Sequence, residues 1–319
     1  MYGQKEEKMT THKQAGTLKK ELTSVIMLVI TLSFGLCLSG ETSGYIKEGL
    51  RLAIECVIPT SLPFMIISDA YVCYGRPENI KLLKKAFQAL FCLPPCGIAA
   101  FICGNICGFP IGAKMVADSY AKGMLSRDDS ERLIALSNNP SCAFIVGGIG
   151  LGIYNDLRTG IILLTAVYLS TFLSGVLTKP NTRNFHFNRD NTKQNYDFVS
   201  SVKNAGVTSI SIISFISIFS AINGIIKKRI KYAYILCLIF AFSEVTNAIK
   251  FFADTAYFPI NSALTLTAFS LGFGGVCVGM QSAVFTAPYG IKMRKYYLIK
   301  LLNAILSASI SSFLFIIIK

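Results

Sequence analysis

Long apolar runs, separated by short polar and basic segments, account for most of the chain. A helix that crosses a hydrocarbon core needs about 20 residues, and most of these runs approach or exceed that length. They span residues 22–38, 50–72, 86–113, 133–155, 159–178, 204–226, 232–252, 255–291 and 301–318. The pattern predicts an all-α polytopic membrane protein with about eight membrane elements.

Two of the runs are too long for one straight span. The run 255–291 would extend for about 55 Å as a helix, whereas a bilayer core is about 30 Å thick. The run 86–113 poses the same difficulty. Helix-breaking residues lie within both: Gly272, Gly274, Gly275 and Pro288 in the first, and Pro94, Pro95, Gly104, Gly108, Pro110 and Gly112 in the second. We therefore expect the chain to turn back or break there, in broken or re-entrant helices.

The segment 104–150 contains the most informative breaks, at Gly108-Phe109-Pro110 and at Asn138-Asn139-Pro140. Lipid offers no partners to unpaired backbone groups, so such breaks are tolerated only where they are buried in protein or line a cavity. The two asparagines either cap the preceding helix or, the interpretation we favour, face a cavity where freed backbone amides meet an anion. The candidate solute-binding residues here are Gly108, Pro110, Gly112, Asn138, Asn139 and Ser141.

Ionisable residues inside predicted membrane runs are functional candidates by default. Asp69 and Lys250 lie near run ends and can reach the membrane interface, and Glu55 can pair with Arg51 four residues earlier. Glu244 lies deeper and has no partner nearby in the sequence. We therefore predict that Glu244 couples to the solute or to protons.

The glycine-rich break in the second half supplies the remaining candidates. Gly274 and Gly275 are predicted to free backbone groups, and Gln281 follows shortly after them. A neutral amide at that position can hydrogen-bond a solute or join two helices. The sequence leaves both roles open for Gln281.

The segment 114–137, between the two breaks of the first half, is predicted to form two short interfacial helices. Gly123 suits the end of the first helix, and Ser126 followed by Asp129 fits a capping box at the start of the second. We interpret the charged residues of this segment as a solvated surface hairpin that positions the breaks on either side.

Composition excludes several classes of function. The net charge is +14, but the cations lie in short loops, where they set orientation and meet anionic lipid head groups. We therefore expect contact with a bilayer and none with nucleic acid. The cysteines lie mostly in apolar runs, and Cys92, Cys96, Cys103 and Cys107 lack an accompanying histidine, so packing is favoured over a soft-metal site. Catalytic and nucleotide-binding fingerprints are absent, so we predict no enzyme, no metal and no cofactor.

The basic loops indicate the topology. They place the N-terminus and the loop around Lys81 on the cytoplasmic side. The loop around Lys81 and the basic loop 179–203 are both predicted to be cytoplasmic, so the chain must cross the membrane an even number of times between them. Three apolar runs lie in that segment, and one of these runs is therefore predicted to be re-entrant. The basic cluster 227–231 follows a single further apolar run, so it does not fit a simple alternation of cytoplasmic and external loops. The sequence leaves the side of the membrane on which this cluster lies open.

We divide the chain into five segments. The first membrane segment is read as a helix rather than a cleaved signal peptide. The two halves share a layout in which a carboxylate-bearing helix, with Glu55 or Glu244, precedes a glycine-broken run, and Phe101 and Gly104 match Phe269 and Gly272 at the same offset. The segments are a basic cytoplasmic N-terminus at 1–21, a first membrane helix at 22–40, halves at 50–178 and 204–319, and a polar linker at 179–203.

The sequence resembles a known family from about Leu50 to its end. The motifs GFPIGAK, GMLSR, SERLIAL and NNPSCAFIVG in the first half, and SEVT and LGFGGVCVGMQ in the second, are similar to those of the sporulation integral membrane proteins that carry the nucleoside-recognition, or Gate, domain. The sequence departs from the family pattern at Asn247-Ala248, where a glycine is usual, and in a short loop before Tyr232.

This resemblance implies a fold of two Gate-type inverted repeats and a role in spore maturation. It implies transport of dipicolinate, a pyridine dicarboxylate, across the outer forespore membrane or cell membrane of a spore-forming bacterium. Our first hypothesis is a transporter of such a small anion, and the alternative is a non-transporting membrane scaffold. The sequence does not determine the coupling ion, the direction of transport or the oligomeric state. A homo-oligomer is one of the oligomeric states that it allows.

Overall fold

The structure is a computed structural model that describes residues 41–74, 77–180, 196–254 and 257–317. The chain divides into two units after Tyr45, and the features below belong to residues 46–319, except for the first residues of α2. The described residues are helical and contain no β-strand, which confirms the predicted all-α class. The predicted N-terminal segment and first membrane helix, and residues 181–195 of the predicted linker, lie outside the described residues.

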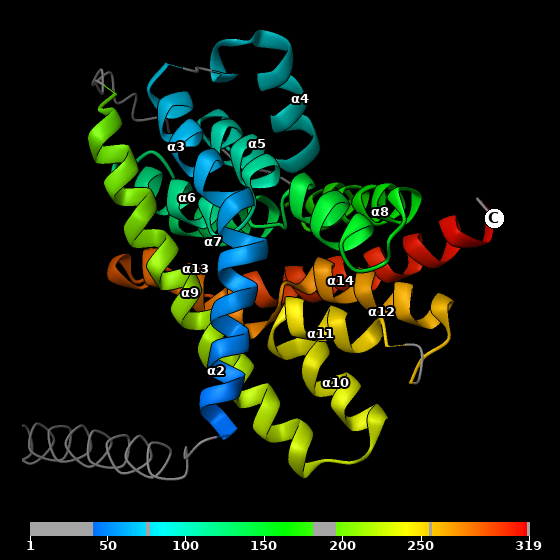
Figure 1. Ribbon diagram of the computed structural model, residues 1–319. Coiled ribbons are helices and arrows are strands. Elements are labelled where there is room, and N and C mark those ends of the chain that lie inside the picture. The colour runs from blue at the N-terminus through cyan, green and yellow to red at the C-terminus, as the bar shows by residue number, and fades with distance from the viewer. Residues whose placement is uncertain (1–40, 75–76, 181–195, 255–256, 318–319) are drawn as a thin grey trace, which may run out of the picture. The chain divides into compact units, whose positions relative to one another are not determined.

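The helices follow one another along the chain (Figure 1). The first half contains α2 (Glu41–Leu52), a wide helical turn η1 (Ala53–Val57), α3 (Ile58–Tyr74), η2 (Pro77–Asn79), α4 (Lys81–Phe91), η3 (Pro95–Gly97), α5 (Ile98–Cys107), α6 (Ile111–Ala121), α7 (Arg127–Ser137), η4 (Phe144–Leu151) and α8 (Leu157–Leu177). The second half contains α9 (Phe198–Arg229), α10 (Ala233–Ser243), α11 (Val245–Phe252), α12 (Ile260–Phe273), α13 (Gly275–Thr286), η5 (Ala287–Tyr289) and α14 (Arg294–Ile317).

Four helical segments in the described residues are long and apolar enough to cross a membrane: Leu157–Leu177, Phe198–Arg229, Ile260–Tyr289 and Arg294–Ile317. Two bent pairs, Thr42–Val57 with Ser61–Tyr71 and Lys81–Phe91 with Pro95–Cys107, raise the number to six if each pair forms one span. The second pair bends by 98° at Cys92 and the two prolines that follow. These bends support the predicted broken or re-entrant helices.

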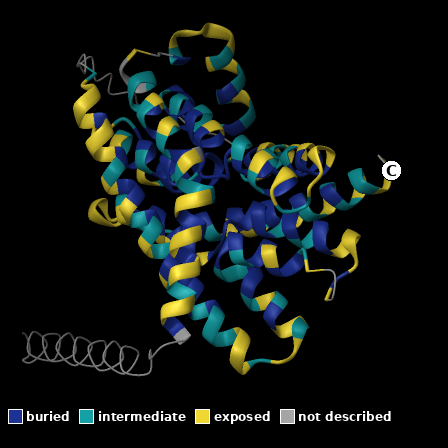
Figure 2. Cartoon of the chain, in the orientation of Figure 1, coloured by how far each residue is buried: buried dark blue, intermediate teal, exposed yellow. Residues whose placement is uncertain are grey.

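The outer faces of the long helices are apolar and exposed, as a lipid-facing surface requires. Val207, Ile210 and Ile218 on α9 are at least half exposed, and Phe313 on α14 is similarly open. The inner faces of these helices are buried (Figure 2), and many small and polar residues are among the buried ones. Exposed apolar outer faces together with buried small and polar residues indicate that these helices contact a bilayer.

Glycines mark the predicted breaks because the backbone there takes conformations that other residues avoid. Gly274 ends α12 in a left-handed conformation, with φ at 84°, which confirms the predicted break in the run 255–291. Gly108 ends α5 with φ at 89°. Its helix then turns back, since a side-chain carbon at Gly104 would lie 2.8 Å from the Cα of Gly112 on α6. Helices α5 and α6 therefore form a hairpin.

The segment 114–137 contains two short helices, as predicted, but the second of them is buried. Gly123 follows α6 with φ at 69°, and the Ser126 hydroxyl accepts a hydrogen bond from the Asp129 amide at 3.1 Å, so the predicted helix end and the N-cap at Ser126 are confirmed. However, Asp129, Glu131 and Arg132 are buried. The prediction of a solvated hairpin is wrong for these charges, because α7 packs between α5, α6 and α14.

Each half repeats one order of elements. A pair of short helices (α5–α6 or α10–α11) precedes a broken helix (α7–η4 or α12–α13), and a long helix (α8 or α14) follows. The long helices α8 and α14 pack against each other, and α14 also packs along α12 (Figure 1). By this order α5 corresponds to α10, whereas the predicted match of Phe101 and Gly104 to Phe269 and Gly272 equates α5 with α12.

Candidate functional site

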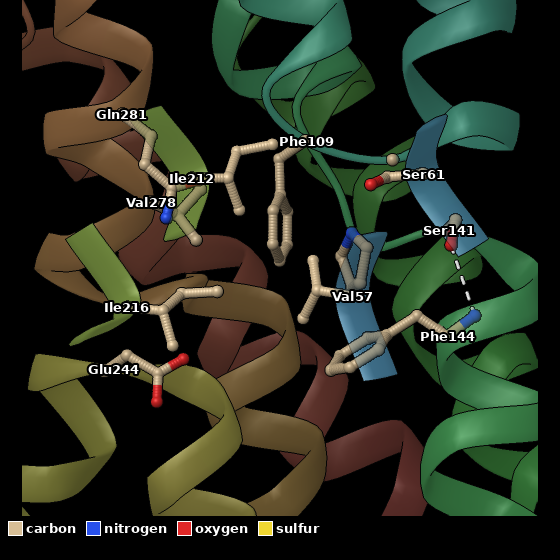
Figure 3. Close-up of a pocket in the computed structure, with 12 residues that line it drawn as sticks. Val57, Ser61, Phe109, Ser141, Phe144, Ile212, Ile216, Glu244, Val278 and Gln281 are labelled. Atoms are coloured by element: carbon tan, nitrogen blue, oxygen red, sulfur yellow. Dashed lines mark hydrogen bonds between the residues drawn. The ribbon is translucent and has the colours of Figure 1, made fainter. Parts of the chain in front are cut away.

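Three breaks in the chain and helix α13 meet at one small cavity (Figure 3). The α5–α6 turn, the start of the helix after α7, the α10–α11 junction and helix α13 after its glycine break each contribute residues, and α9 and η1–α3 complete the wall. The lining consists of Val57, Ser61, Gly108, Phe109, Pro140, Ser141, Phe144, Ile212, Ile216, Glu244, Val278 and Gln281.

The cavity is small in this conformation. Its free space is about 30 Å³, which holds about two water molecules. The ring of Phe109 projects into it from the α5–α6 turn (Figure 3). Two buried oxygen atoms of its lining, Ser61 Oγ and Gln281 Oε1, have no hydrogen-bond partner among the described residues. They are available to a bound molecule.

Glu244 forms the junction between α10 and α11, where the sequence analysis placed one uninterrupted run. Its side chain is only 2% exposed. The carboxylate accepts hydrogen bonds from the backbone amides of Thr246 at 2.9 Å and Asn247 at 2.8 Å. Glu244 therefore caps the N-terminus of α11, where the helix dipole favours an anion. Contrary to the sequence analysis, it does have partners nearby in the sequence, and they are backbone groups.

Asn138 and Asn139 lie behind the cavity, fully buried in a polar network. The side-chain amide of Asn138 donates to Ser282 Oγ at 2.8 Å and to Tyr296 Oη at 3.2 Å. The amide of Asn139 donates to Asn105 Oδ1 at 2.9 Å and to the Leu136 carbonyl at 3.0 Å. Pro140 and Ser141, rather than the asparagines, reach the cavity surface. The structure thus assigns these asparagines mainly to the joining of helices.

Lys300 on α14 completes this network, and the sequence analysis missed it. Its ammonium donates to the Asn138 carbonyl at 3.1 Å and to Asn139 Oδ1 at 2.7 Å, and the residue is fully buried. The last predicted apolar run begins at Leu301, one residue after Lys300. The apolar stretch 296–299 before it is the signal that places Lys300 inside a helix.

Two glycines of the α5–α6 hairpin allow it to lie against the end of α7. A side-chain carbon at Gly104 would lie 1.9 Å from the Ser137 carbonyl oxygen, and one at Gly112 would lie 2.0 Å from the same atom. A side-chain carbon at Gly108 would lie 2.9 Å from the Ser141 amide nitrogen. Gly112 therefore has a packing role and does not line the cavity.

The predicted site residues separate into three groups. Gly108, Ser141, Glu244 and Gln281 line the cavity. Pro110 lines a neighbouring pocket of about 10 Å³. Gly112, Asn138, Asn139, Gly274 and Gly275 form the layer behind the cavity, where Gly275 packs against the Glu244 backbone.

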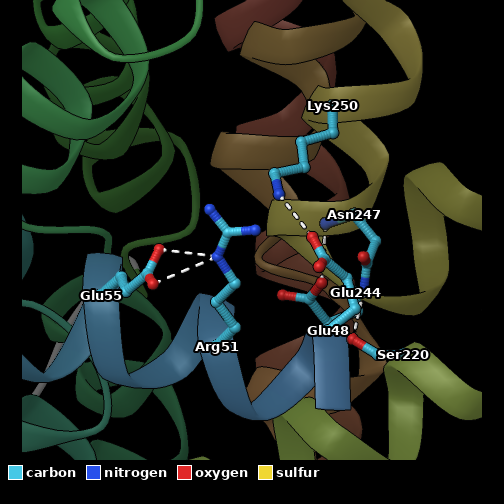
Figure 4. Close-up of polar contacts among 7 residues, drawn as sticks. All are labelled: Glu48, Arg51, Glu55, Ser220, Glu244, Asn247 and Lys250. Carbon is cyan, nitrogen blue, oxygen red and sulfur yellow. Dashed lines mark hydrogen bonds and ion pairs between the residues drawn. The ribbon is translucent and has the colours of Figure 1, made fainter. Parts of the chain in front are cut away.

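The other ionisable residues of the predicted runs form ion pairs. Glu55 pairs with Arg51 at 3.0 Å, as predicted, and Lys250 pairs with Glu48 at 3.1 Å (Figure 4). Both pairs are largely exposed, so they contribute little to stability. Asp69 does not simply point to an interface. It pairs with Lys114 on α6 at 3.0 Å.

A wider cavity of about 920 Å³ opens between α3, α6 and α9. Its lining includes four carboxylates and two lysines: Asp69, Glu78, Asp118, Asp197, Lys114 and Lys122. This acidic balance does not favour a dianion, so the anion chemistry considered below is confined to the breaks.

Within the described ranges there is no group of three or more His, Cys, Asp or Glu side chains placed to hold a metal ion. Cys103 and Cys107 are buried in the apolar core, and the Cys96 thiol donates to the Met124 carbonyl. These cysteines pack as small apolar side chains.

The apolar spans and the bent helix pairs define an integral, all-helical membrane protein with broken or re-entrant helices. The chain is a distant homologue of the sporulation integral membrane protein YlbJ of Bacillus subtilis (strain 168). The two are 25% identical over 309 aligned positions, which cover 82% of this chain and 74% of that protein. No family model matches the chain. No solved structure matches it.

Proposed function

We propose that this protein is a membrane transporter for a small anionic solute, dipicolinate, which it carries across the outer forespore membrane during sporulation. The observation that carries the proposal is the convergence of three chain breaks and helix α13 on one cavity. Broken helices at membrane depth offer backbone groups to a solute and are characteristic of transporter sites. The homology to a sporulation membrane protein supports the setting, and the repeated order of elements supports a pair of Gate-type inverted repeats.

The chemistry of the cavity suits a carboxylate. Two half-helices begin at its wall, at Ser141 and at Glu244, and the N-terminus of a helix stabilises an anion. The carboxylate of Glu244 occupies the α11 amides in the way that a solute carboxylate would. Because Glu244 repels a second anion, we propose that it is protonated or displaced when the solute binds.

The cavity has to enlarge before such a solute enters. A space of about 30 Å³ holds about two waters, and a pyridine ring with two carboxylates is several times larger. We propose that the α5–α6 turn withdraws, which removes the Phe109 ring from the cavity. The conformation described here is then the occluded state of the transport cycle.

Uptake of labelled dipicolinate by proteoliposomes tests the proposal. Purified protein should give saturable uptake that unlabelled dipicolinate inhibits more strongly than pyridine monocarboxylate does, because one carboxylate leaves half of the site unfilled. Protein-free liposomes are the control. If folded protein moves dipicolinate neither into nor out of the liposomes, the transporter hypothesis is contradicted and the scaffold is favoured. A scaffold should also tolerate polar substitutions at membrane depth.

A further inference from the structure

Lys300 is a basic residue in an unusual place. It lies on α14, is fully buried, and forms no ion pair among the described residues. A charged side chain without a counter-ion is costly both inside protein and at membrane depth. The proposed transport cycle above gives Lys300 no role, so its surroundings need an account of their own.

Two oxygen atoms at the end of a helix accept hydrogen bonds from the Lys300 side-chain nitrogen. It donates to the carbonyl of Asn138, the residue at which α7 ends, and to the side-chain oxygen of Asn139. The carboxyl end of a helix carries a partial negative charge. The Asn139 amide nitrogen is committed to Asn105 and to the Leu136 carbonyl, so its oxygen must face Lys300.

The second broken helix packs on the other side of Lys300. A side-chain carbon at Gly274 would lie 3.9 Å from Lys300 Cε. Asn303, less than one turn further along α14, donates to the Gly272 carbonyl at 3.0 Å and also approaches Asn139 Oδ1 at 3.4 Å. The ammonium of Lys300 thus lies where the breaks of α7–η4 and α12–α13 meet.

Carbonyl and amide oxygens at the carboxyl ends of half-helices are the ligands that a dissociable sodium ion or proton takes in transporters with broken helices. Here an ammonium on a four-carbon chain occupies such a cradle. We propose that Lys300 is a tethered cation that fills a monovalent-cation site between the two broken helices, so that no metal cation from solution is needed to hold the breaks together.

Cation-dependent thermal unfolding of purified variants tests this proposal without any solute. Lys300→Ala should unfold at a lower temperature than the wild type in choline chloride. Sodium or methylammonium chloride should raise that temperature with a saturable dependence on concentration, because a small cation refills the cradle. The wild type should unfold at the same temperature in all three salts. Lys300→Met, which fills the space without charge, should be destabilised and should not respond to the cation.

Each result decides for or against the tethered cation. The proposal is overturned if Lys300→Met is as stable as the wild type. It is also overturned if Lys300→Ala unfolds at the same temperature in choline, sodium and methylammonium chloride. Lys300→Ser is the second variant, since its hydroxyl can donate to one of the oxygens and still leaves room for a cation. If neither small variant yields folded protein even at a high concentration of sodium or methylammonium, the proposal also fails.

The consequence for transport rests on the proposed function. Dipicolinate uptake by the wild type should be equal in sodium, potassium and choline buffers, and uptake by Lys300→Ala should require sodium or methylammonium. The two proposals fail separately. Absence of uptake by the wild type would remove the transporter and leave the unfolding result intact, whereas sodium-dependent uptake by the wild type would remove the tethered cation alone.

Discussion

The substitution Asn139→Leu distinguishes the structure from the sequence most sharply. By sequence alone, leucine makes an apolar run more apolar and removes one polar group from a site. In the structure Asn139 is fully buried and joins α5, α7 and α14 through hydrogen bonds to Asn105, the Leu136 carbonyl and Lys300. We therefore expect Asn139→Leu to destabilise the fold before it affects transport.

The magnitude follows from these three bonds. Each of the two neutral bonds contributes about 0.6–1 kcal/mol, and the bond to the ammonium contributes about 1.5–3 kcal/mol. Their loss, with the Lys300 charge left buried beside leucine, should lower the free energy of unfolding by about 3–5 kcal/mol. Asn261→Leu, the same change at an exposed position on α12, should alter it by less than about 0.5 kcal/mol.

Equilibrium unfolding in mixed detergent micelles, followed by circular dichroism, measures both variants against the wild type. If Asn139→Leu unfolds within about 1 kcal/mol of the wild type, the polar network does not hold the breaks together, and the reasoning about Asn139 is refuted. If Asn261→Leu is equally destabilised, the loss is a general effect of leucine on this protein.

Three further substitutions test other parts of the site. Gly112→Ala should destabilise the fold by roughly 3 kcal/mol, because the added methyl group would lie 2.0 Å from the Ser137 carbonyl oxygen. Gly206→Ala is its control: a side-chain carbon there meets no atom within 4 Å, so this variant should unfold at or slightly above the wild-type temperature. Gln281→Leu should fold normally, since it removes an unpartnered buried oxygen, and should weaken dipicolinate binding about fivefold; unchanged binding would exclude Gln281 from the site. Glu244→Gln keeps one oxygen for the α11 amides, so it should fold and lose transport or its pH dependence, and a wild-type uptake rate and pH profile would remove Glu244 from the mechanism.

The sequence determined the class of the protein and the position of most breaks. Apolar runs specify membrane helices because lipid requires apolar side chains on their outer faces, and this signal is local. Gly108 and Gly274 marked helix ends for a local reason as well, since their backbone conformations favour glycine. The N-cap at Ser126 also lies within one turn of one helix. These features needed no knowledge of distant contacts.

Only the tertiary structure decided what surrounds the polar groups. Lys300 reads as the end of a basic loop, and its partners at Asn138 and Asn139 precede it by 162 and 161 positions in the chain. Glu244 reads as an isolated intramembrane charge, although the backbone turns there to place two amides on its carboxylate. The cost of a buried charge depends on the dipoles and oxygens that the fold brings to it. A hydropathy pattern records how apolar each segment is, whereas the role of a buried charge is set by the segments that pack around it.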